Sequence, residues 1–125
     1  MSKPQSPYQR HPDYRVDLAP SDQALQARFG EIVVAQSRKA LIVSETKHDP
    51  VVYFPLEDVV MEYFTATEHH TFCPFKGQAS YWTLRHNGTV AENVMWAYLE
   101  PIAEVAGLKG YAAFYSDRVQ VAPSG

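Results

Sequence analysis

The residues best suited to chemistry lie in one stretch, HHTFCPFKG, which runs from His69 to Gly77. It contains Cys73, the only cysteine of the chain, and Lys76 three positions later. If Cys73 lies at a strand end just before a turn, the Lys76 ammonium comes close to its sulfur and favours the thiolate, the nucleophilic form of cysteine. His70 is then the candidate base. Cys73, Lys76 and His70 are therefore the candidate catalytic residues of a thiol-centred site.

The same stretch has two further interpretations. Free cysteines are usually small buried apolar residues; in that case Cys-Pro-x-Lys-Gly is a structural turn, with φ fixed by Pro74 and an unusual conformation at Gly77. A metal site is the other alternative, because imidazole and thiolate both ligate zinc. Its candidate ligands are His48, His69, His70, Cys73 and His86. Since structural zinc sites usually have paired CxxC motifs, we expect no metal and identify no cofactor.

Aromatic and charged residues elsewhere could line a pocket for a small molecule. Tyrosine and tryptophan each offer an apolar face and one hydrogen bond, which suits ligand sites in β barrels, although aromatic residues at strand spacing are more often core. The candidate ligand-binding residues are Arg38, Glu45, Tyr53, Thr71, Tyr81, Trp96 and Tyr115. Tyr53 is also a candidate acid or base.

Composition and charge exclude several classes of protein. The 125 residues include 11 Lys and Arg against 14 Asp and Glu, a net charge of -3. A protein that binds nucleic acid by counterion release needs a basic excess or a basic face. No apolar run approaches the roughly 20 residues that cross a bilayer, and the polar start MSKPQSPYQRHPDYR has no signal-peptide core. A lone cysteine favours a reducing compartment. We therefore expect a cytoplasmic protein with no nucleic-acid or membrane partner.

The spacing of apolar and turn residues predicts short strands. Residues 23–36 are interpreted as a hairpin broken at Gly30, and 40–45 and 51–54 as two further strands. Asn87-Gly88 predicts a tight turn after residues 80–85, and residues 93–100 are interpreted as a strand in preference to a two-turn helix. A turn is expected around Pro74–Gly77. Residues 55–60 have room for one helical turn, 101–108 form a short turn or helix, and 110–115 with 118–122 form a final hairpin.

These segments predict a mainly β, antiparallel fold. We expect about nine short strands, one or two short helical turns and no internal repeat, arranged as a barrel or as two packed sheets. Residues 1–22 contain four prolines among polar residues and are expected to form an extended N-terminal arm. Residues 23–125 are expected to form a single compact β domain, since a chain of this length supports one core.

Several short motifs, spread over roughly residues 23–121, occur together in one known family. They are Arg28-Phe29-Gly30, Ser37-Arg38, Glu45, Tyr53-Phe54-Pro55 with Asp58-Val59, Thr71-x-Cys73-Pro74-x-Lys76-Gly77-x-Ala79-x-Tyr81, Trp96-x-Tyr98-x-x-Pro101 and Gly110-Tyr111-x-Ala113-Phe114-Tyr115. On these motifs the chain resembles the bacterial domain of unknown function 427 family. The resemblance implies a β-tent domain similar in topology to methionine sulfoxide reductase B. Relatives of that topology often carry zinc on two CxxC pairs, and this chain has neither.

Three functions remain open at this point. The first is a domain that binds an unknown small molecule, or performs thiol-centred chemistry, at a pocket around Cys73 and Lys76. The second is a non-catalytic interaction module or homodimer that uses open sheet edges. The third is nucleotide binding or transfer, with Arg38 and Lys76 contacting phosphate; the resemblance suggests it, because family members sometimes bear the label nucleotidyltransferase. The chain has no GxxxxGK[ST] loop and no Gly-Ser pair with spaced aspartates for that chemistry.

Overall fold

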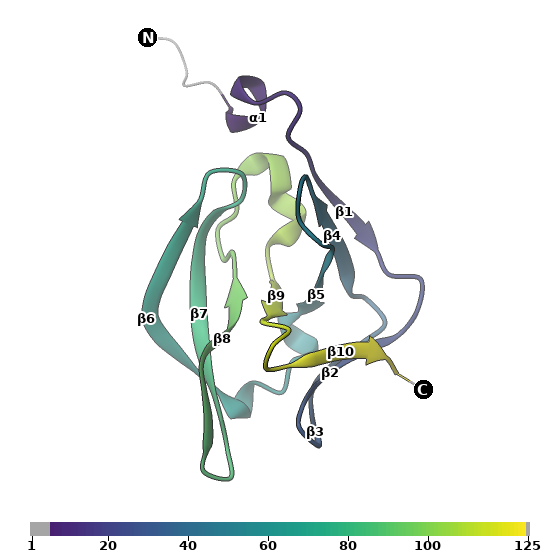
Figure 1. Ribbon diagram of the computed structural model, residues 1–125, viewed down its shortest axis with the longest axis vertical. Coiled ribbons are helices and arrows are strands. Elements are labelled where there is room, and N and C mark those ends of the chain that lie inside the picture. The colour runs from purple at the N-terminus through teal and green to yellow at the C-terminus, as the bar shows by residue number, and fades with distance from the viewer. Residues whose placement is uncertain (1–5, 125) are drawn as a thin grey trace.

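The computed structural model describes residues 6–124, which form two antiparallel sheets (Figure 1). The larger sheet has the strand order β1-β4-β5-β9-β8-β7-β6 and the smaller sheet the order β10-β2-β3. The strands of the larger sheet are β1 (Val16–Pro20), β4 (Leu41–Glu45), β5 (Val51–Pro55), β6 (Phe64–Cys73), β7 (Gly77–His86), β8 (Thr89–Ala97) and β9 (Tyr111–Phe114). Those of the smaller sheet are β2 (Leu25–Phe29), β3 (Ile32–Ser37) and β10 (Gln120–Pro123).

The helical elements are short and lie before or between the strands. They are α1 (Pro7–Arg10) and the 3-10 turns η1 (Leu56–Asp58), η2 (Met61–Tyr63) and η3 (Ala103–Leu108). The prediction of a mainly β, antiparallel domain with only short helical turns is confirmed. In residues 6–124, no helix has the length and apolar character needed to cross a bilayer.

Local turn chemistry explains the hairpins. Gly30 turns the chain between β2 and β3 with φ 60°, and Asn87 and Gly88 turn it between β7 and β8 with φ 48° and 79°. Glycine and asparagine tolerate this left-handed region better than most residues, which is why two-residue hairpin loops prefer them. The hairpins predicted at 23–36 and around Asn87-Gly88 are confirmed, as are the strands at 40–45 and 51–54.

The final hairpin is the clear error of the sequence-based prediction. β9 lies between β5 and β8 in the larger sheet, whereas β10 pairs with β2 in the smaller sheet. After β9 the chain crosses from one sheet to the other, and Val119 is fully buried at this crossing. A long-range partner for β10 therefore replaces the local one.

Part of the segment expected to be an extended arm, Val16–Pro20, forms the edge strand β1 and pairs with β4.

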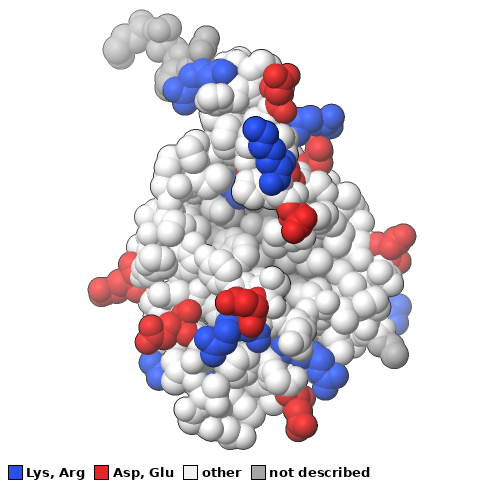
Figure 2. Space-filling view, viewed as in Figure 1, with Lys and Arg blue, Asp and Glu red and all other residues white. Residues whose placement is uncertain are grey.

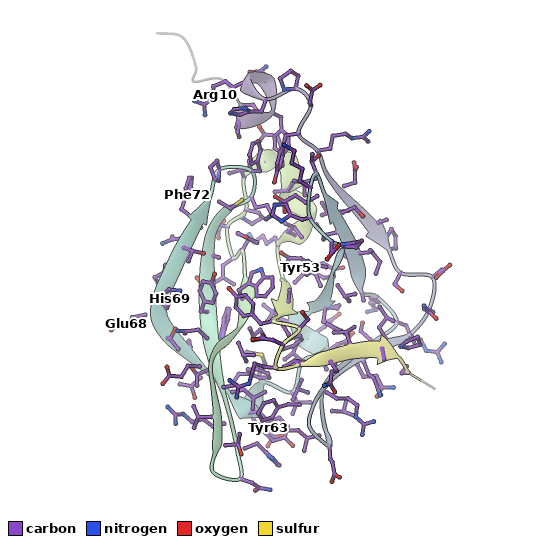
Figure 3. The ribbon with its side chains drawn as sticks, in the orientation of Figure 1. Arg10, Tyr53, Tyr63, Glu68, His69 and Phe72 are labelled. Carbon is purple, nitrogen blue, oxygen red and sulfur yellow. The ribbon has the colours of Figure 1, made fainter. Side chains whose placement is uncertain are left out.

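The larger sheet packs a hydrophobic cluster on each face. One cluster fills the space between the two sheets and includes Phe54 of β5 and Ala112 of β9. The other lies on the opposite face, where Leu108 of η3 packs with Tyr53 and Ala113. Because successive residues of a strand point to opposite faces, neighbours on β5 and β9 belong to different clusters. Figure 3 shows Tyr53 in the interior of the molecule and Glu68 and Phe72 on the outer side of β6.

The larger sheet also curls, and this curvature positions the site. β4 and β7 are separated by three strands in the sheet, yet Glu45 at the end of β4 forms an ion pair with Lys76 just before β7. The two halves of the sheet therefore face each other across the second hydrophobic cluster. Helix α1 lies next to the turn between β6 and β7 (Figure 1). On the face shown in Figure 2, cationic and anionic side chains are interspersed and form no continuous basic patch.

Candidate functional site

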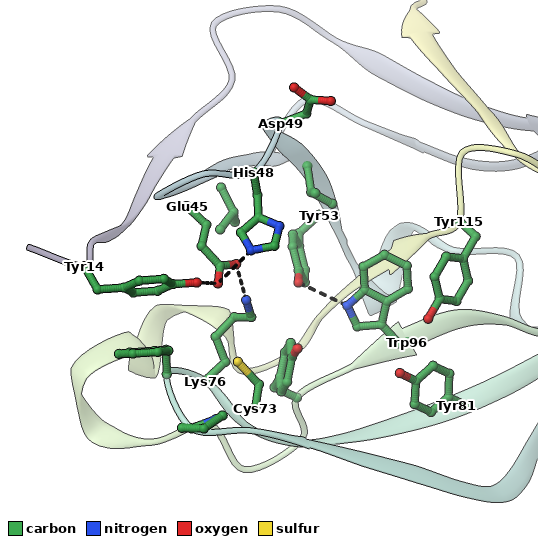
Figure 4. Close-up of a pocket in the computed structure, with 15 residues that line it drawn as sticks. Tyr14, Glu45, His48, Asp49, Tyr53, Cys73, Lys76, Tyr81, Trp96 and Tyr115 are labelled. Carbon is green, nitrogen blue, oxygen red and sulfur yellow. Dashed lines mark hydrogen bonds and ion pairs between the residues drawn. The ribbon is translucent and has the colours of Figure 1, made fainter. Parts of the chain in front are cut away.

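A pocket of about 460 Å³ lies between the two halves of the curled sheet (Figure 4). Side chains from β4 and β5 form one side, and side chains from the β6–β7 turn, β7 and β8 form the other. Its walls are largely aromatic, and its charged groups gather at one end. The aromatic wall residues are Tyr53, Tyr81, Trp96, Tyr98 and Tyr115, and the groups at the polar end include Tyr14, Glu45, His48 and Lys76.

The polar end is built around the Glu45 carboxylate. The Lys76 ammonium donates a hydrogen bond to Oε1, and the Tyr14 phenol donates one to Oε2. His48 Nε2 lies 4.0 Å from Oε2. Burial would raise the pKa of Glu45, but the hydrogen bonds from Lys76 and Tyr14 and the charges of Lys76 and His48 outweigh it and lower the pKa below its usual 4.5. The carboxylate is therefore ionised at neutral pH, and each of its oxygens accepts a hydrogen bond.

The turn between β6 and β7 places Lys76 and Cys73 in the pocket. The Lys76 backbone N–H donates to the Cys73 carbonyl at 3.1 Å, and the Lys76 carbonyl accepts from Ile102 N–H at 3.0 Å. Gly77 ends the turn with φ 120°, and a Cβ there would lie 3.3 Å from the Glu100 carbonyl oxygen. Glycine is thus required both by the backbone angle and by the close approach of the chain. The turn predicted around Pro74–Gly77 is confirmed.

The N-terminal segment covers this turn. The Tyr8 phenol donates a hydrogen bond of 2.6 Å to the Phe75 carbonyl. The Tyr14 ring stacks on the Phe75 ring, with centroids 3.8 Å apart and 17° between the planes. Tyr8 therefore holds the backbone of Phe75, and Tyr14 holds its side chain. Phe75 lies in the turn that carries Cys73 and Lys76.

The aromatic walls are also tied together. Trp96 Nε1 donates a hydrogen bond of 3.1 Å to the Tyr53 hydroxyl, and the two rings are nearly perpendicular, with 87° between their planes. Tyr115 lies against the other side of Trp96, with ring centroids 4.7 Å apart. These contacts fix the rings as a rigid wall, so the pocket has a preformed shape.

Three phenols of the wall, those of Tyr53, Tyr98 and Tyr115, have a raised pKa. Burial raises the pKa of Tyr53 and Tyr98 far above the usual 10, and nearby Glu45 and Cys73 act in the same direction. Burial and the neighbouring Tyr81 phenol raise the pKa of Tyr115 to about 12. A phenol that holds its proton so firmly is a hydrogen-bond donor and a poor general base.

Comparison with known families identifies one match. Residues 17–125 match the family described as Domain of unknown function (DUF427). The chain belongs to this family. The matched region starts within β1 and includes every other strand of both sheets, whereas α1 and Tyr14 precede it. A comparison with curated proteins finds no significant match.

The DUF427 domain brings most of the predicted site residues together. Those that line the pocket are Glu45, Tyr53, Cys73, Lys76, Tyr81, Trp96 and Tyr115. Thr71 is exposed near the rim and contributes through Tyr81, since the Thr71 and Tyr81 hydroxyls are 2.9 Å apart. The two halves of this group come from segments at least 20 residues apart in sequence, so the curl of the sheet is what unites them.

Two predicted residues lie outside the pocket. His70 is exposed on the outer side of β6, with Nδ1 3.5 Å from the Ser80 hydroxyl. Three positions separate it from Cys73, and strand alternation therefore sends the two side chains to opposite faces. Arg38 follows β3 and lines a separate polar hollow with Asp58. The imidazole that lines the pocket of the DUF427 domain is that of His48.

The pocket lining also includes Tyr14, Tyr98 and His48, which were not among the predicted ligand-binding residues. Strand alternation places Trp96 in the wall and also places Tyr98 there, two positions later. Tyr98 could therefore have been predicted from the sequence. Tyr14 reaches the pocket only because of the path of the N-terminal segment, which no local pattern reveals. In the described part of the chain, no three His, Cys, Asp or Glu side chains gather in a way that could hold a metal ion.

Proposed function

We propose that this DUF427 domain binds a small organic molecule in the pocket around Lys76, Glu45 and Trp96. The observation that carries the proposal is a preformed pocket of about 460 Å³ with aromatic walls and a charged pair at one end. Small-molecule sites are typically concave, mostly apolar and of roughly this size, with a few placed polar groups that orient the ligand.

The ion pair supports ligand binding more than it supports a purely structural role. The Lys76 and Glu45 side chains are only 10% and 14% exposed. Removing two charges from water is costly, and buried pairs are often no more stabilising than apolar residues of the same size. A contribution to stability therefore does not account for this buried pair, whereas recognition of a ligand does.

Thiol-centred chemistry is the second candidate, because Cys73 lines the same pocket and is partly exposed. Any such reaction would use His48 and not His70 as the nearby imidazole. It predicts that a ligand of the pocket forms an adduct with the wild-type protein that intact mass spectrometry detects. A Cys73→Ala variant would still bind that ligand but form no adduct.

The charges do not favour a nucleoside triphosphate, although the matching family is also labelled NTP_transf_9. Polyphosphate sites need several cations or a backbone cradle. Lys76 is the only Lys or Arg among the described residues that line the pocket, and Glu45 already pairs with it. Asp49 adds a negative charge to the lining.

The test uses the two tryptophans of the chain as a reporter and its internal control. Trp96 lines the pocket, whereas Trp82 packs against the cluster between the sheets. We expect a ligand from a metabolite library to shift the indole N–H signal of Trp96 in NMR spectra and to leave that of Trp82 unchanged. The same ligand should slow alkylation of Cys73 by iodoacetamide, because both residues line one pocket.

A Trp96→Phe variant assigns the two indole signals. If a broad library of neutral, anionic and cationic metabolites moves neither the Trp96 signal nor the alkylation rate, the domain does not bind small molecules at this site. The alternative of a non-catalytic interaction module would then be favoured.

A further inference from the structure

We infer that the ligand is a neutral molecule with an apolar or planar body and a carbonyl oxygen that accepts hydrogen bonds at the Lys76 end of the pocket. This inference rests on the proposed function and names the chemical class of its ligand. It follows from counting which hydrogen-bonding groups of the pocket are already partnered.

The Lys76 ammonium has hydrogen-bond donors beyond the one that Glu45 accepts. Within residues 6–124, the Lys76 ammonium has three N–H groups and one hydrogen-bonded partner, Glu45. It lies 5.9 Å from the centre of the Tyr98 ring, and the residue is only 8% exposed. Two N–H groups of a nearly buried cation are therefore available at the polar end of the pocket.

The phenols add further donors. In the same part of the chain, the Tyr98 hydroxyl makes no hydrogen bond to protein, and the Tyr53 hydroxyl accepts from Trp96 without donating. No fully shielded side-chain nitrogen or oxygen among the described residues lacks a partner. The Tyr98 hydroxyl must therefore reach open space, and the pocket that Tyr98 lines provides it.

Each oxygen of the Glu45 carboxylate, in contrast, already accepts one hydrogen bond. Glu45 Oε1 accepts from Lys76 and Oε2 accepts from Tyr14. A ligand ammonium would have to compete with Lys76 for this carboxylate. The pocket thus offers free N–H and O–H donors beside a carboxylate that is already paired with a cation, which favours a ligand that accepts hydrogen bonds over a cationic one.

Charge decides between a neutral and an anionic acceptor. Lys76 and Glu45 balance each other, so an anion bound there would find no unpaired Lys or Arg among the described lining residues, in a partly enclosed site that His48 and Asp49 also line. Uncompensated charge is costly where water is excluded. A carbonyl oxygen uses the same donors without this penalty.

The experiment compares three probes with one aromatic body and different polar groups: benzamide, benzoate and benzylamine. Binding is followed at about pH 7.5 from the Trp96 indole signal. We expect benzamide to bind at least about fivefold more tightly than the other two, the factor that one added or lost hydrogen bond gives. Lys76→Met and Tyr98→Phe should each weaken benzamide binding about fivefold. Lys39→Met, at an exposed lysine paired with Glu57, should not change it.

Each result has a separate meaning. Tighter binding of benzoate or benzylamine overturns the ligand class and leaves the proposed function intact. Unchanged benzamide affinity in a folded Tyr98→Phe protein also overturns the class, even if Lys76→Met fails to fold. If none of the probes binds, the ligands found in the metabolite library decide: neutral carbonyl compounds support the class and charged ones overturn it. A library without any ligand rejects the proposed function itself.

Discussion

At the scale of single residues, Glu45 organises the polar end of the pocket. It accepts hydrogen bonds from Lys76 and Tyr14, and His48 approaches the same oxygen as Tyr14. These partners hold the pKa of its carboxyl below 4.5 despite its burial. The carboxylate therefore connects the N-terminal segment, the turn after β4 and the turn before β7, and its ionisation affects all three.

The lowered pKa of Glu45 gives the stability of the domain a defined dependence on pH. The folded state binds the proton of Glu45 less readily than the unfolded chain, so this group stabilises the fold above about pH 4.5 and the contribution is lost as the pH falls below that value. In urea unfolding between about pH 7 and pH 3, the wild-type protein should lose more stability than Glu45→Gln. Glu68→Gln, on the exposed side of β6, should follow the wild type. Parallel curves for wild type and Glu45→Gln below about pH 5 would contradict this.

At the scale of elements, the N-terminal segment acts on the pocket through one turn. Tyr8 bonds to the backbone of Phe75 and Tyr14 stacks on its ring. The same turn carries Cys73 and Lys76. We therefore expect the segment that precedes the matched family region to influence how firmly this turn is held.

Removing the contacts of Tyr8 and Tyr14 with Phe75 should expose the Cys73 thiol. In a variant with both Tyr8→Ala and Tyr14→Ala, we expect Cys73 to react with iodoacetamide about tenfold faster, because local opening of a turn becomes easier when its contacts are lost. Tyr14→Phe, which keeps the stacking and loses the bond to Glu45, should have a smaller effect. Alkylation has a single target, since the chain has one cysteine. An unchanged rate in the double variant would show that the segment does not hold the turn.

The elements also show which features the sequence could predict. The turns at Gly30, at Asn87-Gly88 and before Gly77 were predicted because each depends on the backbone preferences of one or two residues. The partner of β10 was not, because β10 pairs with β2, which lies far from it in the sequence. Glu45 and Lys76 were each identified as candidate residues, but their pairing depends on the curl of a seven-stranded sheet, and Tyr14 depends on the path of the segment before it.

At the scale of the whole molecule, the two faces of the larger sheet differ in their surroundings. One face packs against the smaller sheet, and the other carries the pocket. β5 shows this most simply, because Phe54 is fully buried between the sheets and the adjacent Tyr53 lines the pocket. Substitutions at these two neighbouring positions should therefore have different consequences.

We expect Phe54→Ala to lower the free energy of unfolding by about 3–5 kcal/mol, the usual cost of removing a buried phenyl ring. Tyr53→Phe should cost only about 1 kcal/mol, the worth of one hydrogen bond, because the ring remains. It should nevertheless shift the Trp96 indole N–H signal, whose acceptor is lost. Urea unfolding and NMR measure the two effects. Equal losses of stability at the two positions would contradict the separation of the faces.

The alternation of side chains along β5 has a consequence for how this domain can change over generations. The residues that line the pocket and the residues that pack between the sheets occupy alternate positions of this strand. A substitution in the pocket therefore leaves the packing between the sheets in place and acts on the second cluster, to which the pocket residues Tyr53, Tyr81 and Tyr98 belong. Changes to the pocket lining can thus accumulate without altering how the two sheets meet.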